Sequence, residues 1–493
     1  MPPNLPVGTP LWWLARLHGK LADLHDPLHT LSDYYEGKHP LAFATPKYRR
    51  AFDALLRNLS DNWCGVVVDA VEERLNVQGF RIHQEGASDA LQDSPGDQVA
   101  WTIWQRNNMD AGSQMAHLEA LIKGYSNILV WGDSDGKALI TPEDPTQTYV
   151  EMVPGSRTER AAAIKEWRDD WTGDINATLY LPDLIYKYRA PTPKVEGGGE
   201  PALPQHPKWE PRVPEDEPWP LPNPLGVVPM VPLENRPRML DRCDSEIRTV
   251  IPLQNACNKL VADMLVASEF QAFRQRWATG LEIPLDPETD QPVEPFAAAI
   301  DRLWISESAE TQFGEFQQAD LRVFVNAIET VVQHVATQTR TPPHYFYLSG
   351  QFPSGESIKA AETGLVSKSR RKMVPWGDTH EEVMRLAFLV EGDERANATS
   401  SETIWEDPES RSEAEHTDAM IKLKALSVPD EALWERWGFS PTEISRFKEQ
   451  RAEQALYAPT VTEGLPGGVV AFRGTQVLAP PAPAEANGDG TSE

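Results

Sequence analysis

The clearest pattern of hydrophobic and polar positions lies in residues 319–340. Apolar residues recur there at intervals of three and four, the spacing of one face of an α-helix, at Leu321, Phe324, Ile328, Val331 and Val335. A second set falls on the opposite face of the same predicted helix: Arg322, Asn326, Glu329, Gln333 and Thr337. This polar face is nearly uncharged overall, so it suits a water-filled channel and equally suits an ordinary surface helix. At 1.5 Å per residue the predicted helix is about 33 Å long.

A Pro-Pro loop and a second long helix are expected to follow. Pro342 and Pro343 end the first helix, and the next helix starts near Glu356 and reaches about Arg385. The loop between them carries aromatic and polar side chains: Tyr345, Phe346, Tyr347, Ser349 and Gln351. Because this segment shows no pattern of catalytic residues, we predict a mechanical role. The two helices would line and brace a channel, and the loop would point into it.

The pattern before this segment changes from helical to strand-like. Residues 10–36 and 99–123 have the apolar spacing of helices, and between residues 126 and 190 the period falls to two. An antiparallel meander is therefore predicted, with a hairpin turn at Asp133–Gly136. Residues 191–224 are rich in Pro and Gly, and we predict an excursion or linker without a core of its own.

The remaining segments complete an α+β fold class. Residues 245–277 read as a helix in which Pro252 marks a kink or the true start. Residues 280–318 contain short apolar pieces and several prolines, which predicts a small β-rich insertion between two helices. The C-terminal part, residues 409–457, is helical, with capping boxes at Ser412 and Ser440. Beyond residue 458 the composition is typical of a tail that is disordered at its end.

Charge and cysteine usage exclude several classes of protein. The 493 residues include 46 basic and 74 acidic side chains, a net charge of −28. This argues against binding to nucleic acid by general attraction and against an anionic membrane surface as partner. The three cysteines have no zinc spacing and are expected to be reduced thiols. Without a signal peptide or a long apolar run, we expect no membrane segment.

The search for catalytic or metal-binding motifs finds only weak matches. The segment 132–137 faintly resembles a phosphate-binding loop, but a hairpin turn explains it better because strands flank it on both sides. His25 and His29 are four residues apart, yet Pro27 intervenes and no third ligand is near. His380-Glu381-Glu382 lacks the second histidine of a zincin helix. We therefore predict no catalytic residue, no metal and no cofactor.

Carboxylates are numerous enough to leave an acidic hydrolase or nuclease as an alternative. Its candidate acids would be Asp301, Glu307, Glu310 and Glu315, chosen only because they are present. Solvated acids on the surface of an acidic protein explain them equally simply.

A basic cluster stands out within the second long helix. It consists of Lys368, Arg370, Arg371 and Lys372. A DNA-facing patch is one interpretation. Salt bridges to acids of a neighbouring subunit, or simple solvation, are the others, and we expect an inter-subunit role.

The order of short segments resembles the portal proteins of tailed double-stranded DNA bacteriophages, in the form common in siphophages of actinobacteria. The matching segments are DYYEGKHP at 33–40, VQGF at 77–80, GVVP at 226–229, SEI at 245–247, QTRTPP at 338–343, PSGES at 353–357 and WEDP at 405–408. No single segment is diagnostic, but their order along most of the chain is specific. Residues 191–224 and the tail fit the pattern least.

The resemblance implies a ring of about twelve subunits at one capsid vertex and a fold with four named regions. Carried onto this chain, it implies a wing at 1–240, a first stem helix at 241–278, a clip at 279–318, a second stem helix at 319–340, a tunnel loop at 341–355, a long wing helix and strand at 356–408, a crown at 409–457 and a tail at 458–493. The loop would be the DNA-facing part.

The resemblance also implies a non-enzymatic virion protein that is assembled in the host cytoplasm. It would conduct DNA during packaging and ejection without sequence specificity. Its partners would be the large terminase subunit, a head-completion or adaptor protein and the major capsid protein, with a scaffold as a further candidate. About twelve copies would carry about −336 in charge, which would keep DNA from adhering to a channel wall. Another ring-forming connector protein remains the second alternative.

Overall fold

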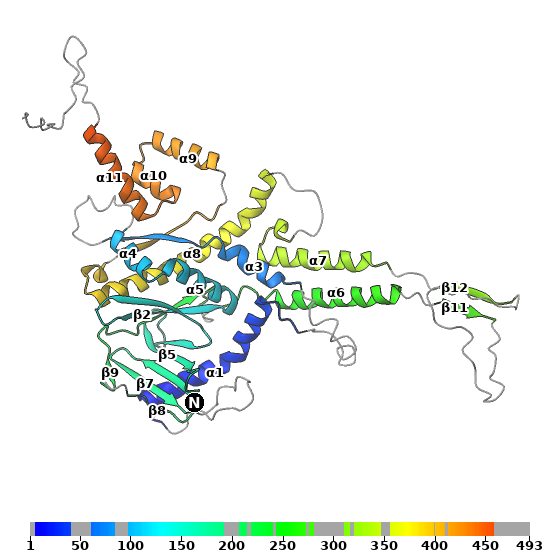
Figure 1. The fold of residues 1–493 in the computed structure, drawn as a ribbon, viewed down its shortest axis with the longest axis horizontal. Helices are drawn as coiled ribbons and strands as arrows, with labels where there is room; N and C mark the ends of the chain where they lie inside the picture. Colours follow the sequence, from blue (N-terminus) through cyan, green and yellow to red (C-terminus); the bar gives the residue numbers. More distant parts are fainter. Residues whose placement is uncertain are drawn as a thin grey trace, which may run out of the picture.

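The computed structural model describes residues 5–40, 61–83, 97–191, 207–213, 218–239, 243–272, 276–280, 310–315, 320–346, 355–398, 400–409 and 413–457. A body of helices and antiparallel sheets carries one pair of long helices that extends to the side (Figure 1). The fold class is α+β, as predicted.

The first helix, α1 (Pro10–Tyr35), matches the predicted range closely. The Thr9 hydroxyl accepts from the backbone N–H of Trp12, and Pro10 occupies the first turn, where its missing N–H costs nothing. Leu14, Leu17 and Leu21 of its first half cover one face of a β-sheet. The second half of α1 enters the main core together with α3 (Trp63–Glu72).

The helix predicted over residues 99–123 is two helices, α4 (Gln98–Arg106) and α5 (Met109–Lys123). The break occurs at Asn108, whose φ of 52° places it in the left-handed region that Asn tolerates better than most residues. Beyond the break Met115 is 57% exposed, although residues 99–123 were expected to form one helix. Trp101 and Trp104 of α4 are buried.

Two antiparallel sheets follow α5. The smaller contains β2 (Tyr125–Gly132), β3 (Ala138–Glu143) and β10 (Met230–Glu234), in the order β10-β2-β3. The larger contains the predicted meander: β4 (Thr148–Met152), β5 (Arg160–Arg168), β6 (Ile175–Tyr180) and β7 (Leu184–Ala190). The hairpin turn is present, and the Asp133 carboxylate accepts from the backbone N–H groups of Asp135 and Lys137.

The Pro-rich excursion contributes more to this sheet than predicted. Two of its described pieces, β8 (Glu210–Pro211) and β9 (Leu221–Pro222), pair with β7. Trp209 and Trp219 pack against the core beneath, and the Trp219 indole donates to the Lys187 carbonyl at 3.0 Å. These pieces therefore have no core of their own, and they extend the sheet and cover a core that other segments form.

The longest helix, α8 (Gly355–Glu391), runs through the body (Figure 1). It packs against β2, β3, β10 and β13 (Ser400–Trp405), and β13 pairs with β1 (Val77–His83). A short 3-10 helix, η3 (Glu394–Asn397), joins α8 to β13. The main core surrounds α8 and includes Trp376, Phe388 and the Trp104 side chain of α4.

Two long antiparallel helices, α6 (Ile251–Ala272) and α7 (Arg322–Thr339), extend from the body side by side (Figure 1). At their far end β11 (Arg276–Thr279) pairs with β12 (Gln312–Glu315). Pro252 is the second residue of α6, so it marks the true start of that helix. Trp277, predicted to lie in the helix, belongs to β11.

The C-terminal helices are α9 (Glu413–Ala425), α10 (Asp430–Trp437) and α11 (Pro441–Tyr457). The capping box at Ser440 is confirmed by reciprocal bonds between Ser440 and Glu443. The box at Ser412 and the tail from residue 458 lie outside the described residues. Among the described residues, no helix is both long enough and apolar enough to cross a bilayer.

A buried histidine pair joins α5 to α8 inside the main core. The Nε2 atoms of His117 and His380 are 2.9 Å apart, and His117 Nδ1 lies 3.1 Å from the Leu75 carbonyl. His117 must therefore donate from Nδ1 and accept at Nε2, while His380 donates. Burial lowers the pKa of His380 to about 3, and burial together with the neighbouring ring lowers that of His117.

Acidification is expected to destabilise the fold through these histidines. As the pH falls below about 6.5, the ordinary pKa of histidine, these histidines become protonated in the unfolded chain but stay neutral in the folded chain. The free energy of unfolding therefore decreases with falling pH until the pH reaches the lower pKa of the folded state. For His380 alone the loss at about pH 5 is about 2 kcal/mol. Urea denaturation at neutral pH and near pH 5 measures it. His380→Gln keeps a donor toward His117 and should lose part of this dependence; an unchanged dependence would contradict the assignment.

Candidate functional site

The pair of α6 and α7 places the predicted polar face as expected over most of its length. Arg322, Asn326, Gln333 and Thr337 are exposed, and Glu329 is half-buried. On the opposite side Val335 is buried, together with Val332 and Ala336, where α7 approaches the body. The first half of the apolar stripe, from Leu321 to Val331, is only half-buried. The helix pair is therefore well packed at its base and open along its outer part.

Two valines of α7 lie outside the predicted stripe and face solvent. Val323 is 65% exposed and Val325 is 44% exposed. Their side chains alternate with the half-buried Phe324, so α7 presents apolar surface on more than one side. Val323 and Val325 do not fit the intervals of three and four that define the apolar face, so that spacing does not identify them.

The predicted loop begins as an anchored segment. Arg340 ends α7 in the left-handed region, and the buried Thr339 hydroxyl donates to the Thr341 hydroxyl at 2.9 Å. The chain then forms the 3-10 turn η2 (Pro343–Tyr345). Phe346 is buried in the main core, where its ring lies 5.6 Å from that of Trp63.

These contacts correct part of the predicted DNA-facing set. Phe346 is only 4% exposed, so within this chain it is a core residue and not a channel residue. Tyr345 is half-buried, and its hydroxyl accepts from Arg74 Nη2 at 2.8 Å. Tyr347, Ser349 and Gln351 lie outside the described residues.

Arg74, at the end of α3, connects the start of the loop to two other segments. Its guanidinium donates to the Tyr345 hydroxyl, to Glu362 of α8 at 3.3 Å, and to the Pro408 carbonyl at 3.1 Å. The loop start, the long helix and the segment after β13 therefore share one side chain. No local sequence pattern indicates this role, because Arg74 stands among other charged residues just after a helix.

A buried charge cluster lies where α6 and α7 meet α8. Glu246, which precedes α6, has a fully buried side chain. Its carboxylate contacts Lys368 Nζ at 2.7 Å, Lys372 Nζ, and Arg236 Nε at 3.0 Å. Lys368 also donates to the Thr339 carbonyl at the end of α7. The cluster thus ties the start of α6, the end of α7 and the middle of α8 together.

The cluster fixes the charge states of its members. Although burial opposes ionisation of Glu246, the three cations hold the pKa of its carboxyl well below the ordinary value. Burial, only partly offset by Glu246, lowers the pKa of Lys372 to about 8 and that of Lys368 below its ordinary value. The carboxylate is therefore firmly ionised.

The prediction for the basic cluster is wrong for its two lysines. Lys368 and Lys372 are buried and paired within their own chain, so they are not available to salt-bridge a neighbouring subunit. Arg370 is exposed and pairs with Asp407 at 3.0 Å and Glu409 at 3.6 Å. Arg371 is exposed.

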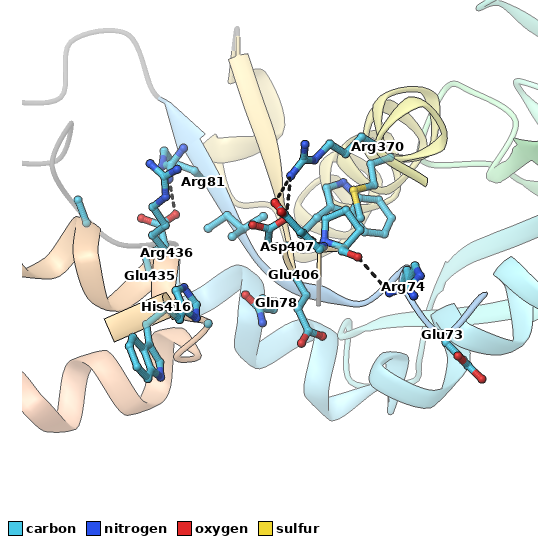
Figure 2. Close-up of a pocket in the computed structure, with 18 residues that line it drawn as sticks. Glu73, Arg74, Gln78, Arg81, Arg370, Glu406, Asp407, His416, Glu435 and Arg436 are labelled. Carbon is cyan, nitrogen blue, oxygen red and sulfur yellow. Dashed lines mark hydrogen bonds and ion pairs between the residues drawn. The ribbon is translucent and has the colours of Figure 1, made fainter. Parts of the chain in front are cut away.

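A second feature is a cleft between β1, β13 and the C-terminal helices (Figure 2). Its volume is about 740 Å³, and it contains both signs of charge. Arg81 of β1 pairs with Glu435 of α10 across the cleft, and Arg370 pairs with Asp407 at another part of its wall (Figure 2). Arg81 also pairs with Glu402 on the neighbouring strand β13. Because the Arg81–Glu435 ion pair joins β1 to α10, we interpret the cleft as the interface at which α10 packs against the body.

The structure places some of the weak metal-site and hydrolase candidates of the sequence. Within them, no group of three or more His, Cys, Asp or Glu side chains is placed to hold a metal ion. The His25 and His29 rings of α1 lie 4.3 Å apart in a tilted arrangement. Of the hydrolase candidates, Asp301 and Glu307 lie outside the described residues, while Glu310 and Glu315 lie at the β11–β12 end of the helix pair.

Comparison with known proteins identifies related sequences. A family model described as "Phage portal protein, SPP1 Gp6-like" matches residues 19–456. The portal proteins of Mycobacterium phages D29 and L5 are each 32% identical to this chain over 414 residues. These alignments cover 79% of this chain, and 79% and 78% of the two relatives. The family match includes the helix pair, the loop start and the long helix.

Proposed function

Because the chain belongs to the SPP1 Gp6-like family of phage portal proteins, we propose that its copies form a ring at one capsid vertex. Double-stranded DNA would enter the capsid through this ring during packaging and leave through it into the tail. The protein is a structural component of the virion and acts as the head-to-tail connector. By the family pattern, the ring holds about twelve subunits.

In this proposal α6 and α7 form the stem, the β11–β12 end belongs to the clip, and residues 413–457 form the crown. The observation that carries it is the exposed polar face of α7, opposite the side on which α7 packs against the body. Arg322, Asn326, Glu329, Gln333 and Thr337 would face the channel. The exposed Val323 and Val325 would be covered by neighbouring subunits, because apolar surface on an isolated helix pair is stabilised by burial.

The channel is proposed to be a passive conduit. A terminase motor would dock at the clip and drive the DNA, and an adaptor protein would replace the motor after packaging. The major capsid protein would surround the ring, with a scaffold as a further assembly partner. The segment from Tyr345 through Tyr347, Ser349 and Gln351 would approach the DNA, anchored at its base by Phe346. The net charge of −28 per subunit supports a wall to which DNA does not adhere.

Added positive charge on the polar face of α7 is expected to slow DNA passage. Asn326→Lys with Gln333→Lys would place lysines along the channel, where they would bind phosphates. Packaging of DNA into procapsids containing the variant ring should fall severalfold. Electron microscopy of the purified ring should still show a central hole.

The matched control is Ser134→Lys, in the exposed β2–β3 turn, which should package as the unmodified protein does. Equal packaging by the α7 variant and the control would contradict the assignment of this face to the channel. A purified protein that never forms rings would contradict the portal function as a whole.

A further inference from the structure

A cationic pocket opens beside the buried charge cluster. It lies between the end of α7, the middle of α8 and residues 236–238, and its volume is about 670 Å³. Six cationic side chains line it: Arg236, Arg238, Arg340, Lys368, Arg371 and Lys372. Among the residues that the structure describes, no carboxylate contributes to its wall. Such a concentration of one sign is unexpected in a chain with a net charge of −28.

Among the described residues, the buried carboxylate beneath this pocket is that of Glu246, and it is already paired. Glu246 is fully buried and paired with Lys368, Lys372 and Arg236, so it does not offset the charge of the outer rim. Arg340 and Arg371 remain exposed on that rim. The pocket therefore presents an anion-binding surface: the guanidinium groups of its rim lie above the buried ion-pair cluster of Glu246.

The other wall of the pocket is apolar and favours a protein as the occupant. Pro237, Val374, Pro375 and Trp376 contribute to it, and Val374 is 67% exposed. A DNA backbone offers phosphates but no group that gains from contact with such a wall. A protein segment offers carboxylates and apolar side chains together, the combination that interfaces bury.

We propose that this cationic pocket receives a carboxylate-bearing segment of a neighbouring copy of this chain. A ring requires two different, complementary surfaces on each subunit, because each copy contacts the next head to tail. A basic concavity on a chain with 74 acidic residues meets that requirement by charge complementarity. The inference rests on the proposed ring. It assigns named residues to one of the two complementary surfaces through which adjacent subunits would contact each other.

Charge reversal on the rim tests the proposal. Arg340→Glu with Arg371→Glu should weaken ring assembly at least about tenfold, measured by mass photometry over a range of protein and salt concentrations. Both residues are exposed, so circular dichroism should show an intact fold. The matched control, Lys20→Glu with Lys422→Glu, changes the net charge equally at exposed sites on α1 and α9 and should assemble normally.

Photo-crosslinking identifies the occupant directly. A benzoyl-phenylalanine side chain at position 374 should crosslink to a peptide of a second subunit that contains Asp or Glu. Adducts confined to the same chain would overturn the proposal. So would binding of a short DNA duplex that the rim variant loses while its rings remain intact, because the pocket would then be a DNA site.

The outcomes also separate this inference from the function on which it rests. If the unmodified chain forms rings and the rim variant forms them equally well, the pocket assignment fails and the portal function stands. If the unmodified chain forms no rings under any condition, both fail together.

Discussion

Replacing Glu246 with Gln is expected to lower the free energy of unfolding by about 3–5 kcal/mol. The substitution keeps the shape of the side chain and removes its charge. Lys368 and Lys372 would then be buried cations without a counter-ion. Burial already lowers the pKa of Lys372 to about 8 in the presence of Glu246, so without the carboxylate it would be held charged only at high cost.

The expected damage is concentrated at one joint. Glu246 lies five residues before the start of α6, and its partner Lys368 also donates to the Thr339 carbonyl in the last turn of α7. Loss of the carboxylate should therefore loosen the base of the helix pair against α8 before it affects the sheets. Hydrogen exchange in peptides covering residues 251–257 and 335–341 should rise more than in peptides from β5 and β6.

Urea denaturation of the monomeric protein measures the change. Asp407→Asn is the matched control, because it removes an acid of an ion pair whose members are both largely exposed. It should cost less than about 1 kcal/mol. Replacing all three buried charged residues at once, as Glu246→Leu with Lys368→Met and Lys372→Met, should recover much of the stability that Glu246→Gln alone loses. A Glu246→Gln variant no weaker than the Asp407→Asn control would show that the cluster is not the stabilising joint.

The buried lysines also show where interpretation of the sequence was limited. Positions 368, 372, 376 and 380 recur every four residues, and all four side chains are buried. That spacing could have placed both lysines on the inner face of α8. A run of adjacent basic residues suggests one surface patch, but only Arg370 and Arg371 of the run lie on the outer face. Their counter-ion, Glu246, is distant in sequence, and no local pattern joins them.

Elements with a long, regular period were predictable, and their interruptions were not. The helices α1 and α7 and the meander from β4 to β7 follow directly from apolar spacing. The break at Asn108 depends on one residue that tolerates a left-handed conformation, and the flanking pattern hides it. The pairing of β8 and β9 with β7 depends on two tryptophans that find a core made by other segments. A single backbone conformation decided the first case and tertiary contacts decided the second, and neither follows from local composition.

Within the described start of the predicted loop, the aromatic residue Phe346 is buried in the core. An aromatic residue after a Pro-Pro turn can face a channel or fill a core, and the choice depends on neighbours that the local sequence does not reveal. Trp63 of α3 provides the core for Phe346, and Arg74 provides a donor for Tyr345. The start of the loop is therefore an anchor for whatever the following residues do.

Removing the Phe346 side chain, which anchors the start of the loop, is expected to lower the free energy of unfolding by an amount similar to that of Glu246→Gln. Phe346→Ala should cost about 3–5 kcal/mol of unfolding free energy, because it deletes a buried aromatic side chain and leaves a cavity beside Trp63. Leu426→Ala is the matched control, since Leu426 is 76% exposed and its truncation should change stability by no more than about 0.5 kcal/mol.

The variant also distinguishes an anchor from a channel residue. If Phe346 holds the base of the loop, its loss should raise hydrogen exchange in peptides from both 341–346 and 63–72 in the isolated subunit, before any ring forms. If Phe346 instead faced the DNA, its truncation would leave the subunit as stable as the Leu426→Ala control. DNA passage through the assembled ring would then be the property that changed. The burial of the ring against Trp63 leads us to expect the first outcome, with the Arg74–Tyr345 bond as the contact weakened next.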